Sequence, residues 1–180
     1  IDILVNNAAA DIARDRVPVV ELADDVWEAV LRVNLTGTFL CSKYAAQAMI
    51  RQGRGGKIVN ISSVHGRRGE FQRAAYCASK FGLLGFTQAL AQELGAHHIN
   101  VNAVCPGIID TDRTANWGAL EARRWGISLE EARTQWLRAI PLGRRGTIGD
   151  VANAVVFLAS DQSDYITGQA INVCGGRFMN

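Results

Sequence analysis

Segments with strand character alternate with long helical segments along the whole chain, and this alternation constrains the fold more than any other feature. Strand-like apolar runs cover Ile1–Val5, Lys57–Ile61, Ile99–Cys105 and Gln169–Val173. Helical patterns lie between them, at about Asp24–Arg51, at Ala74–Leu94 and after Thr147. Such alternation is typical of a parallel sheet with helices on both faces. We therefore expect an α/β fold with a doubly wound parallel sheet.

The ends and faces of the helices are also marked in the sequence. Ser128-x-x-Glu131 and Thr147-x-x-Asp150 are capping signals that open two helices, and Gly95 is a plausible C-cap. In the first long helix, the apolar residues expected to face the core are Trp27, Val30, Leu31 and Leu35.

Asn34 falls on the apolar face of that first helix. A buried amide without hydrogen-bond partners would cost about 1–3 kcal/mol, so the side chain must find partners inside the protein. Asn34 is therefore either a structural or a catalytic residue.

Composition excludes several classes of protein. The 180 residues suit one globular domain, with 48% hydrophobic and 20% charged residues. The net charge is only +2 and no basic stripe is present, which argues against a nucleic acid partner. No apolar run approaches about 18 residues, so no membrane span is expected. The four cysteines lack metal-site spacing; we interpret them as small buried residues of a cytoplasmic protein and expect no metal.

Four polar side chains stand out where the predicted elements meet. Tyr76 and Lys80 form a Tyr-x-x-x-Lys pair, and this spacing places both side chains on one helix face, one turn apart. Ser63 lies thirteen positions before Tyr76 and follows the strand that ends at Ile61. Together with the amide of Asn34, a phenol, an ammonium and a hydroxyl can move a proton onto or off a carbinol oxygen. That chemistry usually accompanies hydride transfer to a nicotinamide.

Three further segments follow directly on predicted strands. They are Asn7–Ala8, Ser63 and Pro106–Gly107. Ligands of open parallel sheets bind beyond the carboxyl ends of the strands. We therefore expect these segments to share one edge of the sheet and to form the binding site there.

Six short segments occur in a fixed order along the chain. They are Asn6–Ala9, Val33–Gly37, Ile61–Ser63, Tyr76–Lys80, Pro106–Thr111 and Tyr165–Val173. In residues and in spacing they resemble the successive signatures of the short-chain dehydrogenase/reductase family, and the resemblance runs from Ile1 to the last residues. It implies a Rossmann-like fold and an NAD(P)-dependent oxidoreductase that interconverts a secondary alcohol and a ketone.

The resemblance also implies catalytic roles for Asn34, Ser63, Tyr76 and Lys80. Tyr76 would be the general acid in carbonyl reduction and the base in alcohol oxidation. A free tyrosine has a pKa of about 10, so the charge of Lys80 would be needed to stabilise the phenolate. Ser63, favoured over its neighbour Ser62 by the spacing to Tyr76, would orient the substrate oxygen. Asn34 would anchor a water that links Lys80 to solvent.

By the same resemblance, NAD or NADP would contact Asn6, Ala8, Tyr76, Lys80, Pro106, Gly107, Ile109 and Thr111. Lys80 would hold the hydroxyls of the nicotinamide ribose, and Ile109 and Thr111 would meet the carboxamide. Ala9 stands where the family usually has glycine, and its methyl group restricts the backbone angles of that loop. The substrate would contact Ser63, Tyr76 and His65.

No glycine-rich turn of the Gly-x-x-x-Gly-x-Gly or Gly-x-Gly-x-x-Gly type follows a strand in this sequence. In the family such a turn holds the pyrophosphate of the dinucleotide, and Ile1–Val5 resembles the family's fourth strand. We therefore expect residues 1–180 to be a single domain that lacks its first three strands, on the order of 75 residues. This fragment alone is expected to be inactive, with an unpaired strand edge at Ile1–Val5. The choice between NAD and NADP normally depends on the missing part.

Residues 112–145 would form a lid over the substrate, with bulk from Trp117, Trp125 and Trp136. Such lids exclude water when they close. A polar pocket would suit a sugar, a polyol or a hydroxy acid, and the segment Ile127–Glu131 looks similar to polyol and sugar-alcohol dehydrogenases. A 3-oxoacyl reductase of the same family is the alternative.

The resemblance further implies a homotetramer, with a small alcohol or ketone as the substrate. A non-catalytic binding protein on the same scaffold is a second alternative, because a fold does not guarantee an activity. A sugar-nucleotide epimerase or dehydratase shares the Tyr-x-x-x-Lys pair. The short region after Pro106 argues against that third reading.

Overall fold

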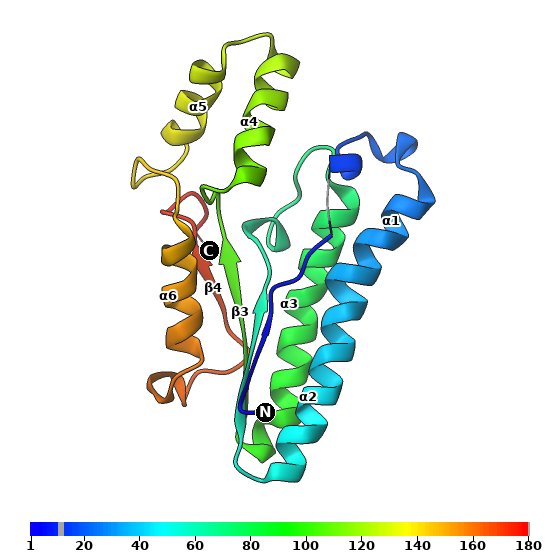
Figure 1. The fold of residues 1–180 in the computed structure, drawn as a ribbon, viewed down its shortest axis with the longest axis vertical. Coiled ribbons are helices and arrows are strands. Elements are labelled where there is room, and N and C mark those ends of the chain that lie inside the picture. The colour runs from blue at the N-terminus through cyan, green and yellow to red at the C-terminus, as the bar shows by residue number, and fades with distance from the viewer. Residues whose placement is uncertain (11–12, 180) are drawn as a thin grey trace.

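The computed structural model describes residues 1–10 and 13–179, without the side chains of residues 13, 113, 115–117, 120 and 121. The described residues form a sheet of four strands in the order β1 (Ile3–Asn6), β2 (Gly56–Ile61), β3 (Ile99–Pro106) and β4 (Ala170–Val173). Every pair of neighbouring strands is parallel. The carboxyl ends of the strands therefore meet at one edge of the sheet (Figure 1).

Helices cover both faces of this sheet (Figure 1). On one face lie α2 (Thr38–Gln52) and α3 (Ala74–Leu94), with α1 (Asp24–Leu31) continuing the line of α2. On the other face lies α6 (Ile148–Leu158). The helices α4 (Asp112–Trp125) and α5 (Leu129–Arg138) form a hairpin that projects beyond the carboxyl edge. The expected α/β fold with a doubly wound parallel sheet is confirmed.

The sheet has a hydrophobic core on each face, and successive side chains along a strand pack into the two cores alternately. Ile58 packs with Met49 in the core under α2 and α3. The next residue, Val59, packs with Val104 and Leu158 in the core under α6. Because strand side chains alternate between faces, a strand covered on both sides needs apolar residues at consecutive positions. This requirement explains the consecutive buried apolar residues Ile58–Val59 and Ala103–Cys105 within the segments that predicted the strands.

The first long helix contains a π-helical turn. Residues Arg32–Gly37 wind as a π-helix between the end of α1 and the start of α2. Such turns insert an extra residue into a helix and are frequent at functional sites. Asn34 lies within the turn and is 1% exposed.

The predicted core face of the first helix is only partly correct. Val30 is buried as expected, but Trp27 is 37% exposed, and Val26 takes the buried position in the first turns of α1. Substantial exposure of Trp27 shows that the three- and four-residue spacing was assigned one position out of phase at the start of the helix.

Both predicted capping boxes are present. Ser128 Oγ accepts a hydrogen bond from the Glu131 amide at 3.2 Å, and the Glu131 carboxylate accepts one from the Ser128 amide at 2.8 Å. Thr147 and Asp150 make the equivalent pair of bonds at 3.1 and 2.7 Å. Gly95 lies at the C-cap of α3 with right-handed backbone angles. The left-handed residue that ends this region is instead His98, with φ 56°.

Among the described residues, β1 pairs with β2 on one side only. Leu4 packs against the core under α2 and α3. Ile3 and Val5 alternate to the opposite face and are 51% and 41% exposed. β1 therefore presents apolar side chains and one strand edge to solvent, as the sequence predicted.

A buried polar network crosses the sheet and joins it to the helices α2 and α3. Asn6 Nδ2 donates to Ser42 Oγ at 2.9 Å and to Asn60 Oδ1 at 2.8 Å. Asn60 Nδ2 donates to Thr87 Oγ1 at 2.9 Å, and Thr87 Oγ1 donates to the Leu83 carbonyl at 2.7 Å. Since Asn60 lies at the centre and is fully buried, it holds the ends of β1 and β2 in register with both helices.

We predict that Asn60→Ala lowers the free energy of unfolding by about 1–3 kcal/mol, because it removes partners from buried polar groups on both sides. Urea denaturation of the purified chain measures this change. Asn153→Ala, at an exposed position of α6, is the matched control and should change stability by less than about 0.5 kcal/mol. Equal effects of the two substitutions would contradict a central role for the network.

Candidate active site

A cavity of about 390 Å³ lies at the carboxyl edge of the sheet, a size that is typical of small-molecule sites. Its walls come from the loop after β2 with the start of α3, from the segment after β3, and from the α4–α5 hairpin. The predicted site residues that line it are Ser63, His65, Tyr76, Lys80, Pro106, Gly107, Ile109 and Thr111. Three other predicted residues, Asn6, Ala8 and Asn34, are not among the residues that line it.

Tyr76 and Lys80 lie one turn apart on α3 and both face the cavity, as the spacing predicted. Lys80 is 3% exposed, and its Nζ donates to the carbonyl of Ile61, the last residue of β2, at 2.7 Å. The same Nζ lies 5.8 Å from the centroid of the Tyr76 ring. The lysine thus joins the helix to the strand end and places a positive charge beside the phenol ring.

The adjacent serines Ser62 and Ser63 have different hydrogen bonds. Ser62 Oγ donates to the carbonyl of Lys80 at 3.0 Å, which fastens the loop to α3. Ser63 Oγ accepts from the His65 amide at 3.1 Å and lines the cavity while being 6% exposed. Because a hydroxyl that only accepts keeps its proton for another partner, the geometry favours Ser63 as the residue that meets a substrate oxygen.

Asn34 connects two parts of the site from behind the cavity. Its Oδ1 accepts from the Ala10 amide at 2.8 Å, and its Nδ2 donates to Ser79 Oγ at 3.0 Å. Ser79 Oγ in turn donates to the carbonyl of Tyr76 at 2.7 Å. The amide of Asn34 therefore orders the loop after β1 relative to the turn of α3 that carries Tyr76. Its predicted role in anchoring a water stays a prediction.

The loop after β1 faces the cavity with residues next to those expected. Asn7 and Ala9 line the cavity, whereas Asn6 is held by Ser42 and Asn60 in the polar network. The structure therefore does not place Asn6 and Ala8 in the cavity wall; because successive side chains at a strand end point to opposite sides, their neighbours Asn7 and Ala9 line it instead.

Two cavity residues that follow β3, Gly107 and Thr111, are also required by the local structure. A Cβ atom on Gly107 would lie 2.8 Å from the Cβ of Cys174, so this glycine lets the residues after β4 approach the cavity floor. Thr111 is the N-cap of α4 and forms a capping box with Thr114. Gly107 and Thr111 therefore each line the cavity and also stabilise the local backbone structure.

Asp15, which the sequence did not single out, holds the N-terminus of α3. Its buried carboxylate accepts from the amides of Ala75 and Tyr76 at 3.2 and 3.0 Å. Burial raises the pKa of Asp15, while these amides and the guanidinium of Arg73 act in the opposite direction. Since Asp15 lies in a short 3-10 helix sixty residues before Ala75, no local pattern could have revealed this cap.

Arg73 is the second residue that the sequence did not reveal. It is 5% exposed, lines the cavity, and places its guanidinium carbon 4.7 Å from the centroid of the Tyr76 ring. Burial lowers the pKa of Arg73, and the charge of Arg16 lowers it further. A position three residues before Tyr76, one helical turn away, was the available signal for this contact.

His65 lies in the cavity wall with its ring centroid 6.3 Å from that of Tyr76. Burial and the surrounding guanidinium groups lower the pKa of His65 from its usual 6.5 to about 3. The arginines responsible are Arg73, Arg177, Arg68 and Arg16. The imidazole is therefore neutral at physiological pH and offers the site a hydrogen-bonding group without charge.

The α4–α5 hairpin supplies the outer wall of the cavity. Trp125 and Trp136 line it, and the guanidinium of Arg124 lies 5.3 Å from the ring centroid of Phe71, across from the hairpin. The side chain of Trp117, also predicted for the lid, is outside the described residues. The role of residues 112–145 as a lid, and the closure of that lid, stay predictions.

Within the part of the chain that the structure describes, no group of three or more histidine, cysteine, aspartate or glutamate side chains is arranged to hold a metal ion. No described helix is both long enough and apolar enough to cross a membrane.

Comparison with known proteins extends over nearly the whole chain. A family model described as Enoyl-(Acyl carrier protein) reductase matches residues 1–177. The chain is 48% identical over 179 residues to the 3-oxoacyl-(acyl-carrier-protein) reductase FabG of Aquifex aeolicus, covering 99% of this chain and 66% of that protein. It is 40% identical over 183 residues to the galactitol 2-dehydrogenase of Agrobacterium fabrum, covering 100% and 69%. The chain thus spans about two thirds of the length of these curated relatives.

Comparison with solved structures also finds dehydrogenases that match nearly the whole chain. The sorbitol-6-phosphate 2-dehydrogenase SrlD of Erwinia amylovora has a TM-score of 0.94 and 35% identity, over 99% of this chain and 69% of that one. A 4-hydroxyisoleucine dehydrogenase mutant complexed with NADH and succinate has a TM-score of 0.87 and 34% identity, over 98% and 68%. Likeness at this level of identity indicates common descent as well as a common fold.

We predict that Asp15→Ala lowers the free energy of unfolding by about 0.5–2 kcal/mol, because two amides at the start of α3 lose their acceptor. Chemical denaturation followed by circular dichroism measures the loss. Asp161→Ala removes an exposed carboxylate from the first turn of a short helix and should have little effect. If both variants lose the same amount, Asp15 does not act as the cap of α3.

We predict that His65 makes the protein less stable in acid. The unfolded chain takes up a proton below pH 6.5, whereas the folded imidazole stays neutral down to about pH 3. Stability is therefore complete above the unfolded pKa and falls as pH drops through this window, by at most about 1.4 kcal/mol per pH unit. Among the described ion-pair partners of His65, the only anion is Glu70, whose carboxylate lies 3.5 Å from His65 Nδ1. Its negative charge favours the protonated imidazole and so opposes the lowering of the pKa.

The measurement is the free energy of unfolding at several pH values for the parent chain and for His65→Gln. The variant should lose less stability between about pH 6.5 and pH 4 than the parent chain does. His97→Gln, at an exposed histidine, is the control and should follow the parent curve. Parallel curves for the parent and His65→Gln would show that His65 is not kept neutral by its surroundings.

Proposed function

The chain belongs to the short-chain dehydrogenase/reductase family, and from that premise we propose that the intact protein is an NAD(P)-dependent oxidoreductase that interconverts a secondary alcohol and a ketone. The observation that carries the proposal is the gathering of Ser63, Tyr76 and Lys80 on one cavity at the carboxyl edge of the sheet. This edge is where open parallel sheets bind nucleotides, so a proton-transfer site there lies next to a hydride-transfer site.

The residues of this chain would handle the proton of the reaction. When bound, the nicotinamide supplies the acceptor or donor of the hydride at the carbinol carbon. In oxidation, Tyr76 as phenolate accepts the proton of the carbinol oxygen, and the C–O single bond becomes the carbonyl. In reduction, Tyr76 returns that proton to the oxygen as the hydride reaches the carbon. Ser63 donates a hydrogen bond to the same oxygen and fixes its position.

Lys80 supports this proton transfer electrostatically. Its ammonium lies 5.8 Å from the Tyr76 ring centroid and is held by the carbonyl of Ile61. A fixed positive charge beside a phenol favours the ionised form, which a base at neutral pH requires. Asn34 contributes by ordering the loop after β1 against the turn of α3 that carries Tyr76.

The cavity residues fit a nicotinamide cofactor. Pro106, Gly107 and Ile109 form a wall beyond the end of β3, on the same cavity as Lys80. The loop after β1 faces this cavity through Asn7 and Ala9, so we assign the cofactor contact of that loop to them in place of Asn6 and Ala8. Both NAD and NADP are compatible with these residues, because the residues that select the ribose follow the second strand of the family fold.

For the substrate we propose a polyol, a sugar or a hydroxy acid. Similarity to a galactitol dehydrogenase and to a sorbitol-6-phosphate dehydrogenase supports this range, as does the polar cavity with His65 in its wall. A 3-oxoacyl reductase is the second candidate, favoured by the 48% identity to FabG. A comparison of kcat/KM for hydroxy compounds and for 3-oxoacyl thioesters separates the two.

For the intact protein we propose a cytoplasmic homotetramer in which residues 112–145 close over the substrate. Exposed apolar side chains on two helices support self-association, since Phe39 and Tyr44 of α2 and Val156 of α6 are 43%, 61% and 66% exposed. The 180-residue chain on its own contains no glycine-rich phosphate turn and should show no nicotinamide-dependent turnover. A non-catalytic binding protein is the alternative if the intact protein is inactive as well.

We predict that Tyr76→Phe lowers kcat of the intact protein by about 10²- to 10⁴-fold, because it removes the proton donor and acceptor while keeping the ring. Absorbance of the reduced nicotinamide follows the rate on a panel of secondary alcohols and ketones. Tyr165→Phe is the matched control, at a tyrosine that is fully exposed, and should leave the rate unchanged. Near-normal activity of Tyr76→Phe would remove this residue from its assigned role.

A further inference from the structure

The two ring nitrogens of His65 have different surroundings. Nδ1 is buried and lies 3.5 Å from a carboxylate oxygen of Glu70, without the geometry of a hydrogen bond. Nε2 is not among the buried atoms that lack a partner, and no described residue donates a hydrogen bond to it. His65 as a whole is 8% exposed and lines the cavity. Nε2 is therefore the ring nitrogen that a ligand in the cavity can reach.

The charge state of the ring decides what Nε2 can offer to a ligand. Burial and the surrounding guanidinium groups lower the pKa of His65 to about 3, so the imidazole is neutral at physiological pH. A neutral imidazole has one N–H donor and one unprotonated nitrogen that accepts. The carboxylate of Glu70 lies beside Nδ1, and its negative charge favours the tautomer with the proton on that nitrogen. Nε2 is then a hydrogen-bond acceptor.

His65 lies next to the groups assigned to the reacting oxygen. Its backbone amide donates to Ser63 Oγ at 3.1 Å. Its ring centroid lies 6.3 Å from that of Tyr76, with an angle of 66° between the two planes. Since Ser63 and Tyr76 would hold the carbinol oxygen, a substituent on the neighbouring carbon atom of the substrate is the one placed to meet the imidazole.

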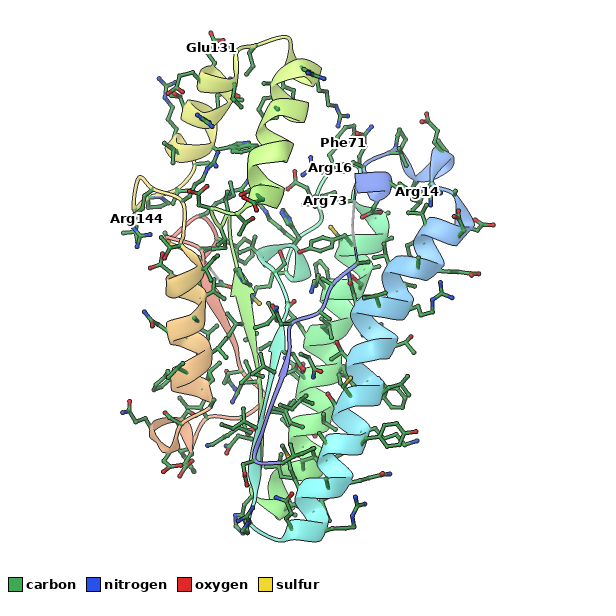
Figure 2. The ribbon with its side chains drawn as sticks, viewed as in Figure 1. Arg14, Arg16, Phe71, Arg73, Glu131 and Arg144 are labelled. Atoms are coloured by element: carbon green, nitrogen blue, oxygen red, sulfur yellow. The ribbon has the colours of Figure 1, made fainter. Side chains whose placement is uncertain are left out.

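Glu70 reaches His65 from the segment that leads to α3. The same segment continues through Phe71 and Arg73, which Figure 2 shows beyond the carboxyl edge of the sheet. The guanidinium carbon of Arg124 lies 5.3 Å from the centroid of the Phe71 ring and joins this segment to α4. The side chain of Glu70 is 37% exposed, so its substitution disturbs the packing less than substitution of the buried His65 does.

We propose that His65 Nε2 accepts a hydrogen bond from a hydroxyl group on the carbon next to the carbinol carbon, so that the substrate is a vicinal diol or the hydroxyketone formed from it. Glu70 is the positioning residue that keeps the ring proton on Nδ1. This assignment rests on the proposed oxidoreductase function and names its substrate class. The hydride leaves the carbinol carbon for the nicotinamide and the carbinol proton passes to Tyr76, while the neighbouring hydroxyl keeps its proton in both directions.

An acceptor at this position separates the substrate candidates. A polyol carries a hydroxyl donor on the carbon next to each of its carbinol carbons. A 3-oxoacyl thioester has a methylene group next to its ketone and only a carbonyl acceptor beyond it. A 2-hydroxy acid presents a carboxylate there, which also accepts. Because two acceptors cannot form a hydrogen bond, the last two classes leave Nε2 without a donor.

The test compares matched substrates on the intact protein with NAD and with NADP. The stereoisomers of butane-2,3-diol are paired with butan-2-ol for oxidation, and 3-hydroxybutan-2-one is paired with butan-2-one for reduction. The members of each pair differ by one hydroxyl group on the neighbouring carbon. We expect kcat/KM of the hydroxylated member to be about 10- to 100-fold higher. The N-acetylcysteamine thioester of 3-oxobutanoate should be reduced more slowly than 3-hydroxybutan-2-one.

Four variants assign the preference to the imidazole and to its tautomer. His65→Phe keeps a ring but removes the acceptor, and should reduce both ratios about tenfold or more. His65→Gln offers a carbonyl oxygen as an acceptor and should retain part of the preference. Glu70→Ala lets the proton occupy either nitrogen and should reduce the ratios about two- to fivefold. Glu93→Ala, at an exposed glutamate of α3, is the matched control and should leave the ratios unchanged.

A second measurement reports the tautomer without turnover. Nitrogen NMR of the histidine side chains separates a protonated ring nitrogen from an unprotonated one, and the signals of His65 are those that disappear in His65→Gln. In the intact protein at neutral pH we expect a protonated Nδ1 and an unprotonated Nε2. Glu70→Ala should show both tautomers. A protonated Nε2 in the parent protein would overturn the assignment.

The remaining outcomes separate this proposal from the proposed function. Equal kcat/KM within both pairs, or ratios that His65→Phe leaves unchanged, would reject the diol. If butan-2-ol is turned over as fast as the diol and Tyr76→Phe removes that activity, the oxidoreductase stands and only the diol is rejected. Absence of turnover on every substrate would reject the oxidoreductase and with it the diol. Should His65→Phe fail to fold by circular dichroism, Glu70→Ala and the NMR measurement decide.

Discussion

The attachment of α3 to the carboxyl end of β2 is the constraint on which the site depends. Two hydrogen bonds form it: Lys80 Nζ donates to the Ile61 carbonyl, and Ser62 Oγ donates to the Lys80 carbonyl. A Cβ atom on Gly66 would lie 2.6 Å from Ser62 Oγ and 2.7 Å from the Lys80 carbonyl oxygen, so a glycine is needed where the loop crosses the helix. Because the helix is held at this point, Ser63 and Tyr76 reach the same cavity from different elements.

Much of the fold was readable because its signals are local. The strands β2 and β3 are covered on both faces and show as short segments rich in apolar residues, and the capping boxes of Ser128 and Thr147 lie within single turns. The Tyr76–Lys80 pair was likewise visible, since one helix face is defined by spacing alone. Of the residues implied by the family signatures, Ser63, Tyr76 and Lys80 line the cavity, whereas Asn6 and Asn34 do not.

The parts that could not be read depend on contacts between distant segments. Asp15 caps α3 from a short 3-10 helix sixty residues earlier in the chain, and Asn34 owes its partners Ala10 and Ser79 to the packing of three segments. Arg73 lies just before a helix whose start the sequence placed correctly; its spacing of three residues from Tyr76 was a signal for their contact, but that spacing does not show that the arginine is buried. Asn6 was predicted to line the cavity, but its neighbour Asn7 lines it instead. The sequence does not show at which residue the strand ends, and therefore does not show which side chain points to the polar network and which to the cavity.

The π-helical turn at Arg32–Gly37 has a consequence for how this chain can vary. The turn accommodates one residue more than an α-helix would, while the helices on either side keep their buried faces. Loss of that single residue by deletion would restore an ordinary helix and preserve the packing of both flanks. It would nevertheless rotate Asn34 away from Ala10 and Ser79. A deletion at this turn would therefore change the surroundings of Asn34 without changing the buried faces of α1 and α2.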